Sequence, residues 1–297
     1  MKDGRLAELA GRQYNRVSRR QLRELGLSDA AIAHRLANRR LVSVEEGVFA
    51  VAPVLDHDEG GKWMGATLTA PATVLSNASA AAAWGIWLRP RQFETVTRPG
   101  SGGPRRHGSI LVYRSSTLEG DCTTLRGIPI TSVERTLLDL ARWMGERALA
   151  RTLREALRLR LTTIAALGDG LGRYHGRRGS RGLAIAVARY AGLPVERARS
   201  GAEIRALEIL RAADRPLPLL NERIAGEEAD LTWRSERLII EIDGGPFHLD
   251  AGEDGRKQGN WEAAGWTVRR QPSEDVYERP HRLLSLAPPP NVPESLL

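Results

Sequence analysis

The chain has 297 residues, a formal net charge of +8 and a single cysteine, Cys122. One cysteine excludes an internal disulfide and any zinc site built on several cysteines. A chain of this length is long enough for two or three domains, since domains usually run to about 100–200 residues. The start lacks the apolar stretch of a signal peptide, and no apolar window is free of polar residues over a membrane span. We therefore expect a cytoplasmic protein without a membrane partner.

The charge is distributed unevenly along the chain. Residues 1–55 carry +4, residues 56–199 carry +10 and residues 200–297 carry −6. A basic body attracts phosphate backbones, whereas acids in the last third would repel them unless a metal neutralises the acids. Nearly all of the positive charge is arginine, a bias that a GC-rich genome also produces. The charge therefore favours a nucleic-acid partner without establishing one.

Residues 1–55 have the pattern of two short helices followed by a β-hairpin. Ser18 can cap a helix that ends at Gly26, and Ser28 can cap a second helix. Apolar runs on either side of Gly47 predict the hairpin. This order is typical of a winged helix-turn-helix, whose second helix enters the major groove of DNA. A small helical domain with a solvated basic face is the alternative. On the first interpretation the DNA-binding residues are His34, Arg35, Asn38, Arg39, Arg40, Arg19 and Arg20.

The same region resembles the amino-terminal domain of AbiEi-type antitoxins, which repress their own operons in type IV toxin–antitoxin systems. The resemblance continues through LTAPATVLSNASAAAAWGI (68–86) and GIPITSVERTLLDLA (127–141), and so covers about the first half of the chain. It implies DNA as a partner and a nucleotidyltransferase-like toxin encoded nearby as a second partner. A homodimer is compatible with it.

The middle region is expected to be mixed α/β. Its most basic loop, GRYHGRRGSRG (172–182), is either a linker or a contact to the DNA backbone, because it lacks the preceding strand and the lysine of a Walker motif. The other expected elements are a helical stretch over 62–88 with Ser76 as a cap, strands over 94–99 and 109–115 joined by a basic loop, a helix from Thr131 or Ser132, and an amphipathic helix over 146–160.

The pattern changes at residue 200. A helix, three antiparallel strands, a helix over 254–264 and a strand over 266–270 form the α/β order of a restriction-endonuclease-like fold. The chain as a whole is therefore predicted to be an α+β multidomain protein. Its expected domains are a winged helix-turn-helix (1–55), an α/β middle domain (56–199) and an endonuclease-like domain (200–297).

The register of one predicted hairpin brings carboxylates together. A tight connection through RSER sets Trp233 opposite Leu238, and the pairing then places Asp230 across from Glu241. Alternation along the strand puts Asp243 on the same face as Glu241. Like charges at cross-strand distance are destabilising unless a positive group lies between them. The sequence therefore predicts a site for a hard divalent cation, Mg²⁺ or Mn²⁺, suited to phosphodiester hydrolysis.

The carboxyl-terminal region resembles the PD-(D/E)XK nuclease superfamily, and more closely its very-short-patch-repair-like branch. The motifs that carry the resemblance are Glu241-Ile242-Asp243-Gly244, His248, Asp254-Gly255-Arg256-Lys257 and Gly265-Trp266-Thr267-Val268-Arg269-Arg270. The resemblance implies that Asp230 and Glu241 hold the metal, and Glu203 matches an acid that the family often carries on its first helix. Asp243 stands where the superfamily motif has a lysine, and His248, Arg256 or Lys257 would then supply a proton or stabilise the phosphate.

Two functions remain open at this point. One is a Mg²⁺-dependent DNA endonuclease or nickase. The other is an AbiEi-like antitoxin and autorepressor whose nuclease fold is catalytically silent. The second would follow if Arg269 or Arg270 on the next strand neutralised the carboxylates, or if Gly255 and Gly259 weakened the helix that usually carries arginines.

Overall fold

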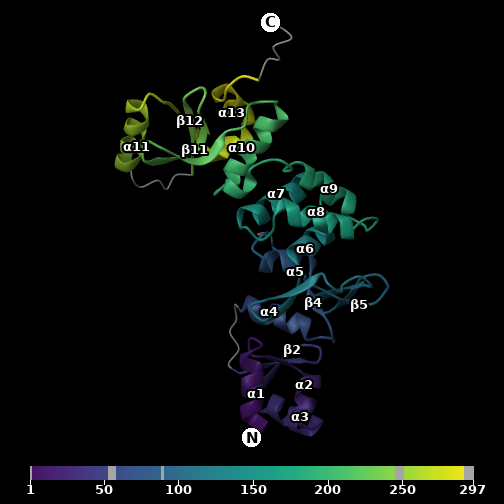
Figure 1. Cartoon of the computed structure of the whole chain (residues 1–297). Helices are drawn as coiled ribbons and strands as arrows, with labels where there is room; N and C mark the ends of the chain where they lie inside the picture. Colours follow the sequence, from purple (N-terminus) through teal and green to yellow (C-terminus); the bar gives the residue numbers. More distant parts are fainter. Residues whose placement is uncertain (1, 53–57, 88–89, 245–250, 291–297) are drawn as a thin grey trace. The chain divides into compact units, whose positions relative to one another are not determined.

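The computed structural model describes residues 2–52, 58–87, 90–244 and 251–290 (Figure 1). Helices and several sheets alternate along the chain, which confirms a mixed α+β class. Among these residues, no helix combines the length and the apolar character needed to cross a membrane. The chain divides into two compact units, which are described separately here. Unit 1 comprises residues 1–152 and 169–183, and unit 2 comprises residues 153–168 and 184–297.

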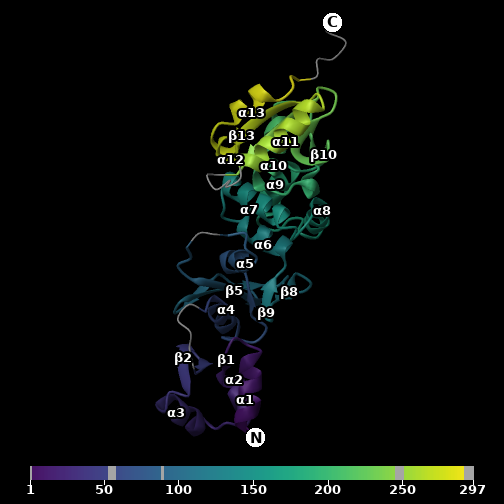
Figure 2. The same ribbon diagram turned by 90° about the vertical axis from the view of Figure 1, so that its left-hand side faces the viewer.

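The amino-terminal part of unit 1 combines three helices with a three-stranded antiparallel sheet of order β1-β3-β2 (Figure 2). Both expected caps are present, because Ser18 forms a capping box at α2 and the Ser28 side chain accepts a hydrogen bond at α3. The first helix and first strand are additional to the predicted elements. The elements are α1 (Lys2–Gly11), β1 (Arg16–Ser18), α2 (Arg19–Glu24), α3 (Asp29–Ala37), β2 (Leu41–Glu45) and β3 (Val48–Val51).

One apolar core holds these elements together. Leu22 of α2 and Ile32 of α3 are fully buried against Val17 of β1 and Phe49 of β3, and Leu6 of α1 closes the cluster. Each of these side chains occupies the inward position of its helix or strand. The burial of Ile32 in this cluster therefore fixes which face of α3 points to the core.

A six-stranded mixed sheet forms the centre of unit 1, with strand order β6-β7-β5-β4-β9-β8. The strands expected near residues 94–99 and 109–115 are confirmed. The helical stretch expected over 62–88 is wrong in its middle, because the chain there forms a short strand between two helices. The basic loop expected after residue 99 also contains a strand. The elements are α4 (Glu59–Thr67), β4 (Val74–Leu75), α5 (Asn77–Ala83), β5 (Glu94–Pro99), β6 (Arg105–His107), β7 (Ile110–Ser115), β8 (Cys122–Leu125) and β9 (Ile128–Thr131).

Four helices follow the sheet. Ser132 caps the first of them, as expected, and the amphipathic helix predicted over 146–160 is present with Leu149 and Leu153 buried. The last three of these helices each pass from one unit to the other along the chain. They are α6 (Val133–Leu140), α7 (Glu146–Arg158), α8 (Ile164–Arg173) and α9 (Ser180–Ala188), and a short 3₁₀ turn, Val195–Arg197, comes next.

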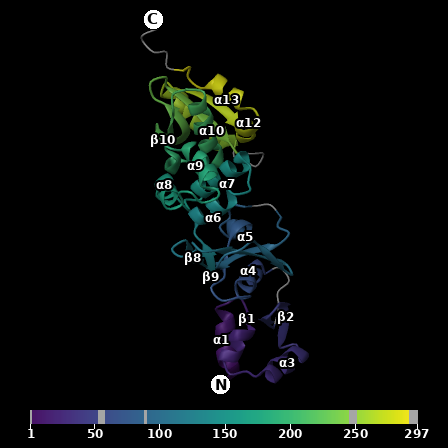
Figure 3. The ribbon, with the colours of Figure 1, turned by 90° about the vertical axis from the view of Figure 1, so that its right-hand side faces the viewer.

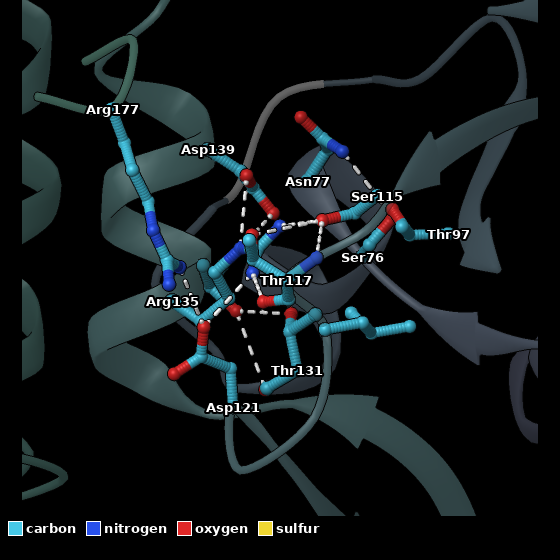
Figure 4. A network of polar contacts seen from close by, with 12 residues as sticks. Ser76, Asn77, Thr97, Ser115, Thr117, Asp121, Thr131, Arg135, Asp139 and Arg177 are labelled. Atoms are coloured by element: carbon cyan, nitrogen blue, oxygen red, sulfur yellow. Dashed lines mark hydrogen bonds and ion pairs between the residues drawn. The ribbon is translucent and has the colours of Figure 1, made fainter. Parts of the chain in front are cut away.

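A buried ionic network joins α6 to the rest of unit 1 (Figure 4). The Arg135 guanidinium donates to Asp121 Oδ2 at 2.9 Å and to both carboxylate oxygens of Asp139 at 3.2 Å. Arg177 also donates to Asp121 Oδ2, at 3.1 Å, and the Tyr174 hydroxyl donates to Oδ1, at 3.1 Å. The network therefore links residues 169–183 to the loop before β8, although neither segment is close to the other in sequence.

Unit 2 is centred on a four-stranded sheet of order β10-β11-β12-β13. Its first three strands are antiparallel, and β13 runs parallel to β12 after a crossover through α11. Helices α10, α12 and α13 pack together (Figure 3). The elements are α10 (Gly201–Ala212), β10 (Leu219–Ile224), β11 (Glu227–Trp233), β12 (Leu238–Asp243), α11 (Ala251–Ala263), β13 (Thr267–Pro272), α12 (Ser273–Glu278) and α13 (Pro280–Leu286).

Candidate functional site

The predicted hairpin register is confirmed where β11 and β12 pair. Trp233 lies opposite Leu238, and the ladder continues to Leu231 opposite Ile240. One residue further along both strands, the side-chain carboxylates of Asp230 and Glu241 accept hydrogen bonds from backbone N–H groups, in place of backbone carbonyls. The backbone N–H of Asp230 donates to Glu241 Oε1 at 3.0 Å, and the N–H of Ile242 donates to Asp230 Oδ2 at 2.8 Å. Each acid is thus held by the strand that carries the other.

The two carboxylates lie side by side in a half-buried position, with further acids nearby. Burial raises the pKa of Asp230 to about 6, and repulsion from Glu203 and Asp243 adds to that rise, although the Ile242 N–H opposes it. Burial and the nearby Asp230 raise the pKa of Glu241 to about 7. Both values express the cost of placing two negative charges side by side away from water. A bound cation or a proton would relieve this cost.

Asn221 of β10 lies beside Asp230, on the side away from Glu241. Asn221, Asp230, Glu241 and Arg270, one from each of the four strands, are called the polar row below. The pairs Leu220–Leu231 and Glu222–Ala229 bracket it, so the register sets Asn221 beside Asp230. Its φ of 51° is left-handed, which is costly for a residue other than glycine. The side-chain amide donates to Glu203 Oε2 at 2.7 Å and to the Arg197 carbonyl at 3.0 Å. Asn221 therefore ties buried Glu203 of α10 to the edge of the row.

Arg270 of β13 closes the row on the opposite side. The parallel pairing sets it beside Glu241, and its guanidinium donates to Asp243 Oδ1 at 2.8 Å. A second acid, Asp254 of α11, lies 3.6 Å from the same guanidinium. Arg269, the other arginine considered from the sequence, instead donates to the Leu286 carbonyl. Of the acids Asp230, Glu241 and Asp243, Asp243 is thus the one that forms an ion pair with an arginine of the described residues.

The remaining residues that the sequence analysis proposed for catalysis belong to α11 and the segment before it. The positive charge of Lys257 lowers the pKa of Glu241 slightly against the effects that raise it. Arg256 instead forms an ion pair with Glu227 of β11. Gly255 and Gly259 do not interrupt α11, which is continuous. His248 lies outside the described residues.

The fit of a metal to these residues can be judged from the oxygens that they offer. No group of three or more His, Cys, Asp or Glu side chains within the described part of the chain has the arrangement of a metal site. Glu203 Oε2 is occupied by Asn221 and by the N–H of Arg199. Mg²⁺ commonly uses only one or two carboxylates together with waters and a substrate phosphate. Asp230 and Glu241, each with one oxygen free of the backbone hydrogen bonds described above, fit that smaller requirement.

The expected DNA-binding residues differ in how free they are. Arg35 is drawn back into the fold, because its guanidinium forms a 2.7 Å ion pair with Asp3 of α1 and its side chain is 18% exposed. Arg39 and Arg40 are exposed, and their side chains form no hydrogen bond or ion pair among the described residues. His34 and Asn38 are exposed and contact each other at 2.9 Å.

The two arginines at the start of α2 are also engaged. Arg19 shares Asp29 with Arg23 and stacks over Phe49, and Arg20 pairs with Glu24 one turn later. These pairs are exposed, so they are weak and can exchange for a phosphate. Arg39 and Arg40 therefore offer the most accessible positive charge near α3.

Two contributors were not anticipated from the sequence. Asn221 has an ordinary strand context, and nothing in that context signals its left-handed φ of 51°. Asp3 lies in α1, a helix that was not predicted from the sequence. A polar residue opposite an acid in the predicted register would have been the signal for Asn221. Comparison of the sequence with protein-family models and with curated proteins finds no match.

Proposed function

We propose that the protein binds duplex DNA through its α2–α3 region and cleaves or nicks a DNA strand with Mg²⁺ or Mn²⁺. The observation that carries the cleavage is the Asp230–Glu241 pair. Both carboxylates are half-buried and held by backbone N–H groups, and neither forms an ion pair with a described lysine or arginine. Two acids built in this way gain most from a divalent cation.

The order of elements in residues 2–52 supports the DNA-binding half of the proposal. Helix, strand, two helices and a hairpin follow one another, as expected for a winged helix-turn-helix, and α3 is capped and packed on its apolar face. Arg39 and Arg40 follow the carboxyl end of α3, and neither forms an ion pair within the described residues, although the charge of Arg40 contributes to lowering the pKa of Asp3. Their charge is available for phosphates or base edges.

The chemistry follows from the residues around the pair. A divalent cation, when bound, would polarise the scissile phosphate and lower the pKa of a coordinated water. Asp230 and Glu241 would hold it through the oxygens that the backbone leaves free. Lys257 lies close enough to Glu241 to lower its pKa, and so can attract the substrate phosphate. Arg270 fixes Asp243 beside the pair and balances its charge.

A nicking assay on supercoiled plasmid tests the cleavage. The wild-type chain should convert plasmid with Mg²⁺ or Mn²⁺ and not with EDTA, and Asp230→Ala or Glu241→Ala should abolish conversion while DNA binding survives. Glu222→Gln is the matched control, because Glu222 belongs to the same sheet but is paired with Arg234. Equal conversion by Asp230→Ala/Glu241→Ala and wild type would exclude this site.

DNA binding is tested separately. Arg39→Ala/Arg40→Ala should weaken binding and reduce its dependence on salt, since each lost phosphate contact removes about 0.9 from the slope of log K against log salt concentration. Arg158→Ala/Arg234→Ala serves as the control of equal charge, because both arginines pair with acids and lie outside the α2–α3 region. An identical loss in both variants would show that only net charge matters.

One observation favours a second function, an AbiEi-like autorepressor with a silent nuclease fold. Arg270 already neutralises Asp243, and Asp230 and Glu241 each give one oxygen to a backbone N–H, which leaves a pair instead of a larger carboxylate group. This function predicts tight binding to the promoter of its own operon and no metal-dependent nicking. It also predicts that co-expression with a nucleotidyltransferase-like toxin encoded nearby relieves toxicity.

A further inference from the structure

The six-stranded sheet of unit 1 carries three arginines on adjacent strands. Arg98 of β5 lies directly beside Arg114 of β7 in the parallel register. Arg105 of β6 pairs with Val112, which precedes Arg114 by two residues and therefore shares its face. Arg98, Arg105 and Arg114, called the arginine row below, thus occupy one face across β6, β7 and β5.

The row is unusual because nothing described neutralises it. Other arginines of unit 1 with little exposure have acids nearby, such as Arg16 with Asp58 and Arg91 with Glu94. Within the described residues, none of the three row arginines forms an ion pair, and the Arg114 guanidinium donates only to the Ser101 carbonyl, at 3.4 Å. Like charges in directly opposed strand positions repel each other. The free protein therefore carries an uncompensated repulsion that an anion would remove.

The loop beside the row keeps it accessible. Residues 100–104 are exposed, and Gly100 and Gly102 have φ values of 132° and 111°, which few other residues adopt. A Cβ at Gly102 would lie 3.1 Å from Nη1 of Arg114. The glycines thus leave the guanidinium of Arg114 uncovered.

The face that carries the row is also the face next to the amino-terminal part of unit 1. Val96 and Val112 on this face pack with Met64 of α4, and α4 in turn contacts β1 and β2. The Ser109 hydroxyl, before β7, donates to Glu45 at the end of β2. A long polyanion bound by the α2–α3 region could therefore continue over this side of the sheet.

We infer that the arginine row is a second contact surface for the phosphate backbone of duplex DNA. Arginine forks suit phosphate because they donate two parallel hydrogen bonds. The inference rests on the proposed DNA binding, and it adds a site outside the helix-turn-helix region. It assigns the row to affinity and not to sequence choice, because phosphate contacts position a protein without reading bases.

The test compares two triple variants of the full chain on a promoter duplex and on a random duplex. Arg98→Gln/Arg105→Gln/Arg114→Gln should weaken binding to both duplexes equally, and should make the slope of log K against log salt less steep by about 2 to 3 units. The control, Arg12→Gln/Arg158→Gln/Arg234→Gln, removes the same charge from arginines that already pair with acids. It should change the slope by less than about 1 unit.

The possible results separate this inference from the proposed function. A row variant that keeps the wild-type slope, with wild-type DNA binding intact, overturns the inference and leaves the proposed function standing. Equal slope changes in the row and control variants also overturn it. Wild-type protein that binds no duplex would overturn the proposed DNA binding and this inference with it. Vesicles of anionic lipid serve as a second probe. If the row variant loses binding to these vesicles and keeps wild-type binding to duplex DNA, the arginine row is not a DNA site. Thermal melting of each variant confirms that it is folded.

Discussion

The acid pair Asp121–Asp139 of unit 1 and the acid pair Asp230–Glu241 of unit 2 are held in opposite ways. In unit 1, Asp121 and Asp139 each contact Arg135, and Asp121 also contacts Arg177. In unit 2, the hydrogen bonds that Asp230 and Glu241 accept from described residues come from backbone N–H groups. Burial raises the pKa of Asp139 as well, but Arg135 works against the rise. The difference teaches that an ion pair with arginine offsets the charge of a buried acid, whereas the Asp230–Glu241 pair, which has no such ion pair among the described residues, keeps raised pKa values.

The largest expected effect comes from breaking the compensated network. Arg135→Ala would leave Asp121 and Asp139 buried without their shared cation, which should cost about 3–5 kcal/mol of the free energy of unfolding. Chemical denaturation of the full chain, followed by a probe in unit 1, measures the loss. Arg20→Ala, which removes an exposed pair, should cost less than about 0.5 kcal/mol. A similar cost for both variants would contradict the assigned role of Arg135.

The uncompensated pair should show the opposite response. Its pKa values, raised to about 6 and about 7, mean that the folded chain holds protons more tightly than the unfolded chain. Stability in unit 2 should therefore fall as the pH rises from about 4 through 7. Asp230→Asn/Glu241→Gln should remove this fall, so the variant melts higher than wild type at pH 8 and equally at pH 4. Parallel melting curves across that range would refute the assignment.

Mn²⁺ should act on the pair as the substitutions do. Addition of Mn²⁺ at pH 8 should raise the melting temperature of the wild-type chain and leave that of Asp230→Asn/Glu241→Gln unchanged, because a ligand that binds only the folded state stabilises it. The size of the rise in melting temperature depends on the ratio of the Mn²⁺ concentration to its Kd. Equal shifts in the two proteins would place the bound metal elsewhere.

A smaller effect tests how finely the unit 1 network is built. Tyr174 is fully buried, and its hydroxyl donates to Asp121 Oδ1 at 3.1 Å. Burial and the nearby Asp121 raise the pKa of Tyr174 to about 12, so the donor proton is retained at neutral pH. Tyr174→Phe should therefore cost about 1–2 kcal/mol, measured by chemical denaturation. An unchanged midpoint would mean that this hydrogen bond contributes no net stability.

The smallest effect concerns the strain beside the acid pair. Asn221→Ala and Asn221→Gly both remove the amide that holds Glu203, but only glycine adopts a φ of 51° without cost. Asn221→Gly should thus be more stable than Asn221→Ala by about 1 kcal/mol. If the alanine variant is equally stable, the strand has relaxed and the left-handed φ is not enforced by the sheet.

Local signals in the sequence predicted much of this molecule. Ser18, Ser28 and Ser132 cap helices because a cap is decided by residues three positions apart. The Trp233–Leu238 register followed from a short connection and alternation, and it led directly to the Asp230–Glu241 pair. Features that depend on distant partners could not be predicted in this way.

The features that were missed illustrate the reason. The partner of Arg35 is Asp3, 32 residues away and on a helix whose weak pattern gave no clear signal. The strand at 74–75 has only two residues, and it exists because β5 and β9 pair with it on both sides. Arg270 and Asp243 are 27 residues apart in sequence and come together through a parallel crossover. The sequence alone did not indicate which of the two neighbouring arginines, Arg269 or Arg270, would contact Asp243. The division into three domains stays a prediction, beside the two units described here.

The polar row of unit 2 also has a consequence for biosynthesis. Its members come one from each of four strands, with Asn221 first and Arg270 last along the chain, so no shorter fragment contains the complete row. The strand that brings Arg270 is added only after a parallel crossover, and contacts of this kind form late because they close a long loop. A growing chain on the ribosome would therefore expose its α2–α3 region long before it completed the polar row of unit 2.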